Sequence, residues 1–473
     1  MSVSSERVSV NGAIGAGVSD APRLKRALKL RDLVLYGVII VCPISPAPFF
    51  GALIKTGHGH AALTILIALF AMLPTALSYG RMANAYPSAG SAFAYVGREI
   101  NPFLGYLAGW GMVMDYLLNP LISIIWVSQQ AHVYMVAIPY SAWAILFAAL
   151  ATGLTIHGIR VSARVNAVMG SLMGVVIVLF LAAAVHYVLN HPHADSGFFI
   201  RPFYDPKAWN LTAILGGTSL AMLTYIGFDG ISTLSEECEN PRRNILIATV
   251  MTCVVVGILS IVEVYGAELV WPASEPFPDL DTAFTFAAQR AWAPLFVVVG
   301  VTLMVALMAI AIAAQLALAR LLYGMGRSGA LPKGFFGKIH ARTHIPRNNV
   351  LLIGALALIG ALILPAISGS ATGYELGANL VNFGALISFM GVNAAALVRY
   401  YLRADEKRLV NLVLPAVGFT VCLILWWNLS TRAHVFGLAW MTLGIAYAAW
   451  TTRGFRRSLV VFEGAAETAE SAE

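Results

Sequence analysis

The sequence carries very little charge. Only 11% of its 473 residues are Asp, Glu, Lys or Arg, whereas 59% are hydrophobic. A soluble domain needs about 25% charged residues to cover its water-facing surface, so a soluble globular protein is excluded, and so is a disordered chain. The 42 glycines and 21 prolines show no triplet repeat of the collagen kind. The composition therefore indicates a polytopic helical membrane protein.

Cysteine is also scarce. The four cysteines lie in or beside apolar segments without a CxxC pair, which excludes a disulfide framework and argues against a metal or redox centre; they are Cys42, Cys238, Cys253 and Cys422. The chain lacks the GxxxxGK(S/T) loop that cradles phosphates, which argues against a nucleotide-driven pump. It also lacks a clustered His or Cys set of the kind that an enzyme needs. We predict no enzyme, no metal and no cofactor.

Long apolar runs are what the chain does have. A span needs about 20 apolar residues to cross about 30 Å of hydrocarbon. Twelve segments qualify, at roughly 33–55, 61–83, 103–129, 141–158, 165–189, 209–235, 245–270, 292–322, 349–367, 377–400, 409–428 and 434–451. The connections between them leave no room for a soluble domain.

The basic residues predict how the spans are oriented. If residue 1 lies inside and the spans alternate, 25 of the 30 Lys and Arg residues fall on the inner side. Because such residues accumulate in cytoplasmic loops, both termini are predicted to be cytoplasmic. The net charge of +7 then reflects orientation and gives no indication of a nucleic-acid partner.

Two of the predicted spans contain a break. The first reads Cys42-Pro43-Ile44-Ser45-Pro46-Ala47-Pro48 in its middle, and three prolines in six residues rule out a continuous helix. The sixth reads Thr224-Tyr225-Ile226-Gly227-Phe228-Asp229-Gly230, where two glycines flank an acid. Irregular backbone at membrane depth is tolerated where it is buried or lines a cavity.

The positions of the two breaks predict an inverted repeat. Five spans precede the second broken helix, which itself starts another five, and the two broken spans run in opposite directions. Interrupted spans at corresponding positions of two halves indicate a transporter's binding site. We expect a cytoplasmic segment at 1–31, repeats at 32–190 and 209–403 separated by an extracytoplasmic loop at 191–208, two further spans within 404–457, and a disordered tail at 458–473.

Several motifs resemble those of the amino acid–polyamine–organocation permease superfamily, and within it those of the putrescine importer group. The motifs are Gly80-Arg81-Met82-Ala83-Asn84-Ala85-Tyr86-Pro87-Ser88-Ala89-Gly90, Asn101-Pro102-Phe103-Leu104-Gly105, Gly227-Phe228-Asp229-Gly230-Ile231-Ser232-Thr233, Ala319-Arg320-Leu321-Leu322-Tyr323-Gly324 and Asn382-Phe383-Gly384-Ala385-Leu386. The resemblance implies a LeuT-like fold of 12 helices, with substrate held between spans 1, 3, 6 and 8. It also implies alternating access driven by an ion gradient, often of protons, in a bacterial inner membrane.

This chain departs from the superfamily's patterns at two places. Polyamine-importing relatives tend to carry an acid in the first break, and many amino acid permeases place a lysine in the fifth span. Here the first break has no acid, and Val168-Met169-Gly170-Ser171-Leu172 has no base. The substrate and the coupling ion therefore stay open at this point.

The acids inside the spans are candidates for substrate and proton binding. An acid at mid-membrane costs about 2.5–3.5 kcal/mol on insertion scales, so Asp115, Asp229 and Glu263 are candidate proton carriers. Asp229 could instead cap the half-helix that follows it, Asp115 could tie its helix to a neighbour, and Glu263 could reach the interface. The predicted substrate contacts are Cys42, Ile44, Ser45, Ala47, Asp115, Tyr225, Gly227, Phe228, Asp229 and Gly230.

The expected function is proton-coupled import of a small amine or amino acid, such as a putrescine-like cation or a cationic amino acid. A neutral amino acid permease or an amino acid/amine exchanger of the same superfamily is the alternative. A channel or nutrient receptor is a third class, because broken helices suit gated access and do not by themselves establish transport.

Overall fold

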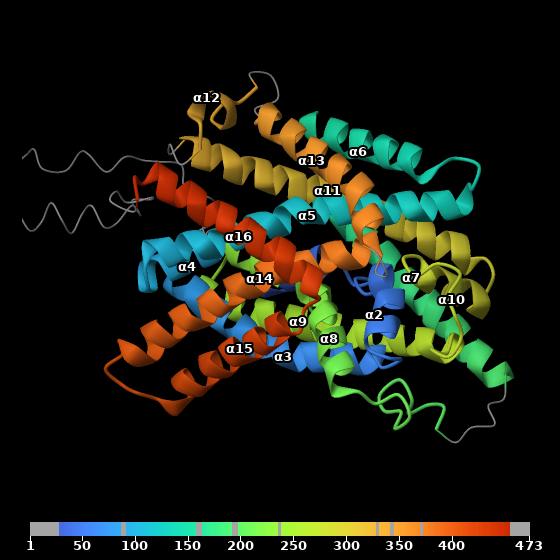
Figure 1. The fold of residues 1–473 in the computed structure, drawn as a ribbon. Coiled ribbons are helices and arrows are strands. Elements are labelled where there is room, and N and C mark those ends of the chain that lie inside the picture. The colour runs from blue at the N-terminus through green and yellow to red at the C-terminus, as the bar shows by residue number, and fades with distance from the viewer. Residues whose placement is uncertain are drawn as a thin grey trace, which may run out of the picture.

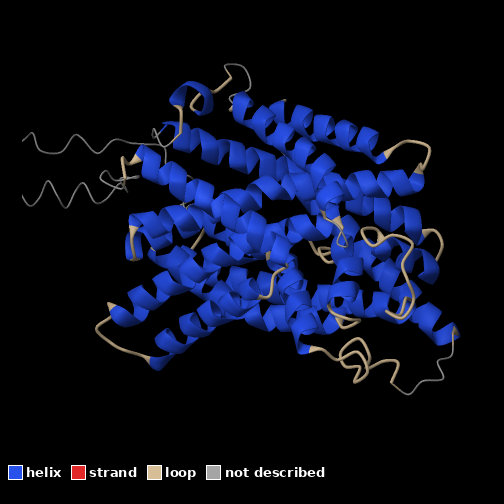
Figure 2. Cartoon of the chain, in the orientation of Figure 1, coloured by secondary structure: helices blue, strands red, loops and turns tan. Residues whose placement is uncertain are grey.

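The structure is a computed structural model, and it describes residues 28–86, 91–157, 163–191, 197–234, 238–327, 331–340, 345–368 and 372–454. Within these ranges the chain forms helices joined by turns, with one isolated bridge between Leu28 and Cys238 (Figure 1, Figure 2). Helices satisfy their own backbone hydrogen bonds, as a bilayer requires. The predicted all-helical membrane class is confirmed, whereas residues 1–27 and the predicted tail 458–473 lie outside the described residues.

Ten helices in the described ranges are long and apolar enough to cross a membrane. They are α3 (Ala61–Ala85), α5 (Pro102–Tyr134), α7 (Ala163–Asn190), the interrupted helix that begins with α8 (Leu211–Ala221), α9 (Pro241–Val270), α11 (Leu295–Arg327), α13 (Arg347–Ile367), α14 (Gly373–Leu397), α15 (Leu409–Trp427) and α16 (Thr431–Thr451). Large apolar side chains are exposed along α7, α13, α15 and α16, as expected of surfaces that face lipid.

The two remaining predicted spans are shorter or interrupted. Residues 33–55 form α1 (Leu30–Val41), the 3-10 turn η1 (Ala47–Phe49) and α2 (Phe50–Thr56), and residues 141–158 form the apolar helix α6 (Tyr140–Ile156). Short helices in the connections are α4 (Ser91–Glu99), α10 (Ala283–Ala291) and α12 (Lys333–Phe336), and α14 continues as the π-helical turn η4 (Val398–Leu402).

Helices that lie five spans apart in the sequence pack on each other. α3 packs on α9, α5 on α11, and α6 on α13. The two broken spans contact each other's neighbours in the same way: α1 packs on α9, the helix that follows the second broken span, and α8 packs on α3, the helix that follows the first. An inverted repeat of two five-span halves pairs equivalent helices in this way, and the boundaries of the two repeats stay a prediction.

α5 is the central helix, and small residues allow α14 to cross it closely. A Cβ atom on Gly111 of α5 would lie 2.8 Å from the carbonyl oxygen of Gly384 on α14. Ser388 Oγ donates a hydrogen bond of 2.7 Å to the Ala108 carbonyl at the same crossing. Small residues of this kind let helix backbones approach in membranes, and the contact fixes α5 beside the breaks.

The bundle has two distinct ends. α4 and α12 lie at one end, and α2 and α10 lie toward the other (Figure 1); we call them the α4 end and the α10 end. At the α4 end the Glu99 carboxylate, 2% exposed, pairs with Arg399 at 2.6 Å and with Arg403 at 3.1 Å. Tyr86 donates a hydrogen bond of 2.6 Å to the same carboxylate. This network ties α4 to the η4 turn.

Candidate functional site

The first span is interrupted where its prolines cluster. α1 ends at Val41, and Cys42 takes a left-handed φ of 71°. The three prolines that follow have no N–H to donate, so the chain passes through turns and η1 before α2 begins at Phe50. The predicted break is confirmed.

The sixth span is interrupted at its glycine. α8 ends at Ala221 and continues as the 3-10 turn η2 (Met222–Tyr225). Ile226 is extended, and Gly227 has a φ of 113°, a conformation that side chains other than glycine rarely adopt. The chain then resumes as the 3-10 helix η3 (Phe228–Leu234). This break is confirmed as well.

The two breaks are adjacent in space. Ser45 Oγ in the first break donates a hydrogen bond of 3.4 Å to the carbonyl oxygen of Thr224 beside the second. The C-terminal ends of two helical segments therefore meet here, α1 from the α4 end and α8 with η2 from the α10 end. Helix C-termini carry a negative partial charge, so this point attracts cations.

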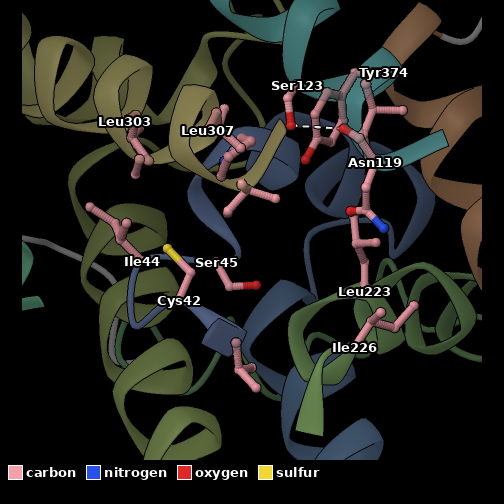
Figure 3. Close-up of a pocket in the computed structure, with 15 residues that line it drawn as sticks. Cys42, Ile44, Ser45, Asn119, Ser123, Leu223, Ile226, Leu303, Leu307 and Tyr374 are labelled. Atoms are coloured by element: carbon pink, nitrogen blue, oxygen red, sulfur yellow. Dashed lines mark hydrogen bonds between the residues drawn. The ribbon is translucent and has the colours of Figure 1, made fainter. Parts of the chain in front are cut away.

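A cavity of about 70 Å³ lies between the breaks, α5 and α11. Its polar wall consists of Cys42, Ser45, Asn119, Ser123 and Tyr374. Its apolar wall includes Ile44, Ile122, Leu223, Ile226, Leu303, Leu307 and Ile310. Figure 3 shows Cys42 and Ser45 on one side of the cavity and Asn119, Ser123 and Tyr374 on the other.

Asp115 reaches the cavity through Asn119. Both residues lie on α5, one turn apart, and Asn119 Nδ2 donates a hydrogen bond of 2.6 Å to Asp115 Oδ1. The Asn119 carbonyl in turn accepts a hydrogen bond of 2.8 Å from Ser123 Oγ (Figure 3). Asp115 is 6% exposed and does not itself line the wall. The carboxylate is thus one hydrogen bond away from a ligand in the cavity.

Asp229 lies at the start of η3. Its carboxylate faces the backbone N–H groups of Gly227, Asp229 and Gly230, and Ser232 Oγ donates a hydrogen bond of 2.6 Å to its carbonyl. The side chain therefore caps the second half of the broken helix. It also interacts electrostatically with Asp115, so the two buried acids belong to one region beside the cavity.

The predicted aromatic residues of the second break are packed away from the cavity wall. The Tyr225 hydroxyl donates a hydrogen bond of 2.9 Å to the Ile65 carbonyl. The Phe228 ring packs edge-on against Tyr79, with centroids 5.4 Å apart, and lies 5.2 Å from Phe389. These contacts join the second break to α3 and α14.

Of the predicted substrate contacts, the cavity wall gathers three. Cys42, Ile44 and Ser45 line it. The remaining seven lie in the breaks or behind the wall and are not part of its lining; they are Ala47, Asp115, Tyr225, Gly227, Phe228, Asp229 and Gly230.

Sequence reasoning missed the contributions of other helices. Asn119 and Ser123 could have been found, since they follow Asp115 at helical spacing as polar residues in an apolar span. The α11 residues and Tyr374 have no such local signal.

Glu268 was also missed: it is 5% exposed, and its two carboxylate oxygens accept hydrogen bonds of 3.0 and 3.1 Å from the N–H groups of Ala61 and Ala62. It caps α3.

A second acidic group lies at the α10 end. The Trp126 indole donates a hydrogen bond of 2.7 Å to the Asp281 carbonyl. Burial raises the pKa of the Asp281 carboxyl to about 7; the nearby Asp279 and Glu375 add to this shift, and a hydrogen bond with Thr372 opposes it. This loop borders the helix that contributes Tyr374 to the cavity.

An all-helical membrane protein with two adjacent broken helices around a buried cavity has the architecture of a secondary transporter. The amino acid permease family model matches residues 49–452. The chain belongs to this family, within the amino acid–polyamine–organocation superfamily, and is therefore a transporter of an amine or amino acid and not an enzyme.

The relatives differ in what they are named for. The low-affinity putrescine importer PlaP of Escherichia coli is 32% identical, over 94% of this chain and 97% of the relative. The branched-chain amino acid permease BcaP of Bacillus subtilis is 25% identical, over 91% and 94%. The vacuolar cationic amino acid transporter 4 of Arabidopsis thaliana is 28% identical, over 82% and 65%.

Proposed function

We propose that the protein imports a small organic amine without a carboxylate, of the putrescine class, by alternating access coupled to a proton gradient. The substrate is held in the cavity between the two breaks. Its ammonium groups are placed at the C-terminal ends of α1 and of α8 with η2, and its carbon chain lies against the aliphatic wall.

The observation that carries this proposal is the small number of free backbone N–H donors at the first break, where the Ile44 N–H faces the Cys42 sulfur and the other N–H groups have carbonyl acceptors. The three prolines have none, and the N–H groups of Ser45, Ala47 and Phe49 donate to carbonyls within the same segment at 3.0 to 3.2 Å. Each carbonyl oxygen has a second lone pair and can accept a further hydrogen bond. The segment therefore offers acceptors for an ammonium group and few donors for a carboxylate.

The second break supports the same substrate class. The start of η3 is a further place where a carboxylate could find backbone N–H groups, but the Asp229 side chain already faces them. An ionised carboxylate buried without donors is strongly destabilised. A substrate that has two ammonium groups and no carboxylate avoids this cost, and Asp115 and Asp229 compensate its positive charge.

A branched-chain or other neutral amino acid is the second candidate. The wall contains Ile44, Ile122, Leu223, Leu303 and Leu307, and none of its lining residues in the described ranges carries a carboxylate. Such a wall suits an aliphatic side chain as well as the methylene chain of a diamine. This alternative needs another source of donors for the α-carboxylate.

The experiment is uptake of labelled putrescine, arginine and leucine into proteoliposomes, with and without an inward proton gradient. Accumulation of putrescine against its own gradient, driven by protons, is the expected result. Accumulation of leucine alone favours the second candidate, and failure of every substrate to accumulate refutes secondary transport.

The same proposal includes an orientation. The short helices α4 and α12, which belong to two of the predicted cytoplasmic connections, lie at the α4 end (Figure 1), so we place that end and both termini in the cytoplasm of a bacterium and the α10 end outside its inner membrane. The division into repeats at 32–190 and 209–403 is part of this proposal.

A further inference from the structure

Glu263 on α9 is fully buried, and neither of its carboxylate oxygens has a hydrogen-bond partner in the described part of the chain. The contrast with Glu268, five residues further along the same helix, is sharp. The Glu268 carboxylate is buried too, but both its oxygens accept hydrogen bonds from the start of α3. These bonds give Glu268 a structural role, and Glu263 makes no such bonds within the described part of the chain.

Glu263 lies behind the first break. It interacts electrostatically with the thiol of Cys42, the residue at which α1 stops and one that lines the cavity. The Cys42 sulfur in turn lies 3.8 Å from the sulfur of Met173 on α7. Because α9 packs against both α1 and α7, a movement of the broken helix changes the surroundings of this carboxyl.

Charged and titratable groups on the elements packed around α9 are engaged elsewhere, and the Tyr225 hydroxyl of η2 donates to the Ile65 carbonyl. His60, just before α3, contacts the Gly57 carbonyl and the Asp205 N–H. Arg290 of α10 pairs with Glu275 at 2.7 Å, and Asp229 of η3 faces its own backbone. Glu263 itself forms neither a hydrogen bond nor an ion pair within the described ranges, so no cation there neutralises it.

A buried carboxylate with neither a cation nor a donor is far more costly than its neutral acid. We propose that Glu263 is the residue that binds the co-transported proton. This proposal rests on the proposed function and adds the site of proton binding to it. The carboxylate takes up one proton when its surroundings open to the acidic side. It stays neutral in the conformation described here, and it releases the same proton when the broken helix opens the cavity to the other side.

The test compares two activities of one preparation in proteoliposomes. Counterflow of labelled putrescine measures alternating access without a gradient. Accumulation driven by an inward proton gradient, with proton entry followed by an internal pH dye, measures coupling. We expect Glu263→Gln to keep counterflow but to lose at least tenfold in putrescine-dependent proton entry and in driven accumulation.

Glu268→Gln is the matched control, since it removes a buried carboxylate from the same helix. In Glu268→Gln, the ratio of driven accumulation to counterflow should equal the ratio in the unsubstituted protein. The ratio is compared because it does not depend on how much folded protein each preparation contains. If Glu263→Gln does not fold, Glu263→Asp replaces it, with the pH dependence of coupled uptake expected to shift.

The possible results separate the two proposals. Absence of putrescine counterflow in the unsubstituted protein refutes the substrate class. Counterflow by an unsubstituted protein that moves no protons leaves the substrate class standing and overturns the role of Glu263. The role of Glu263 is also overturned if Glu263→Gln moves protons at the rate of the unsubstituted protein. An unchanged pH profile of coupled uptake in Glu263→Asp overturns that role as well.

Discussion

The crossing of α5 and α14 provides a direct test of the packing that holds the site. A methyl group added at Gly111 would lie 2.8 Å from the Gly384 carbonyl oxygen, whereas ordinary contacts begin at 3.4 Å. The obstructing atom belongs to the backbone, so no side-chain rotation relieves the clash. The two helices must separate by about 0.6 Å, the difference between these two distances.

We expect Gly111→Ala to lower the free energy of unfolding by about 1–3 kcal/mol, the usual cost of overpacking a core. Gly384→Ala meets the Gly111 carbonyl even more closely and should cost at least as much. The double variant should cost less than the sum, because the separation forced by the first methyl group makes room for the second. The effect extends to function, since α5 carries Asp115 and Asn119.

The assay is thermal unfolding of the purified protein in detergent, with Gly153→Ala as the matched control. Gly153 lies on α6, and a Cβ atom there meets nothing within 4 Å. In a helix, alanine is favoured over glycine by up to about 1 kcal/mol, so the control should keep or raise the Tm. Equal Tm values for Gly111→Ala and Gly153→Ala would refute the close crossing.

Three further predictions concern single side chains. Glu99→Gln should lower the Tm because it leaves Arg399 and Arg403 without their buried partner. In the control, Glu406→Gln, the ion pair with Arg408 is exposed, with side chains 76% and 74% exposed, so the free energy of unfolding should change by at most about 1 kcal/mol. The pKa of the Asp281 carboxyl is about 7 in the folded state and about 3.9 in the unfolded state, so between these pH values only the folded state keeps the proton. The free energy of unfolding should therefore fall as pH rises from about 4 to about 7. Asp281→Asn should flatten this part of the profile of Tm against pH. Asn119→Ala should raise the KM for putrescine about tenfold or more. It removes an amide oxygen that can accept a hydrogen bond from an ammonium group, and it removes the link to Asp115; an unchanged KM would exclude Asn119 from the site.

The sequence was sufficient to predict the breaks but not the cavity. Three prolines between Cys42 and Phe49, and the glycines beside Asp229, are local signals that act through backbone geometry alone. The residues that α11 and α14 contribute, such as Leu303 and Tyr374, are ordinary apolar or aromatic residues until the fold brings them to the breaks. Tertiary contacts, which no single segment encodes, decide which of them face the substrate.

The buried acids show the same limit. Asp115 and Glu263 stand out in the sequence as charges in apolar spans, but the pattern does not say which of them is paired. The hydrogen bond from Asn119 and the two N–H groups that bind Glu268 come from the folded arrangement. Burial alone therefore does not distinguish a structural acid such as Glu268 from the acids proposed to act in transport, because the hydrogen-bond partners follow from the fold.

The most direct test of the substrate class is equilibrium binding of labelled putrescine to the purified protein, with unlabelled ornithine as the competitor. Ornithine keeps both amines and the carbon chain of putrescine and adds one α-carboxylate. Because the breaks leave few donors for that group, putrescine should bind at least tenfold more tightly, a difference of about 1.4 kcal/mol or more. Equal or tighter binding of ornithine would contradict the proposed substrate class.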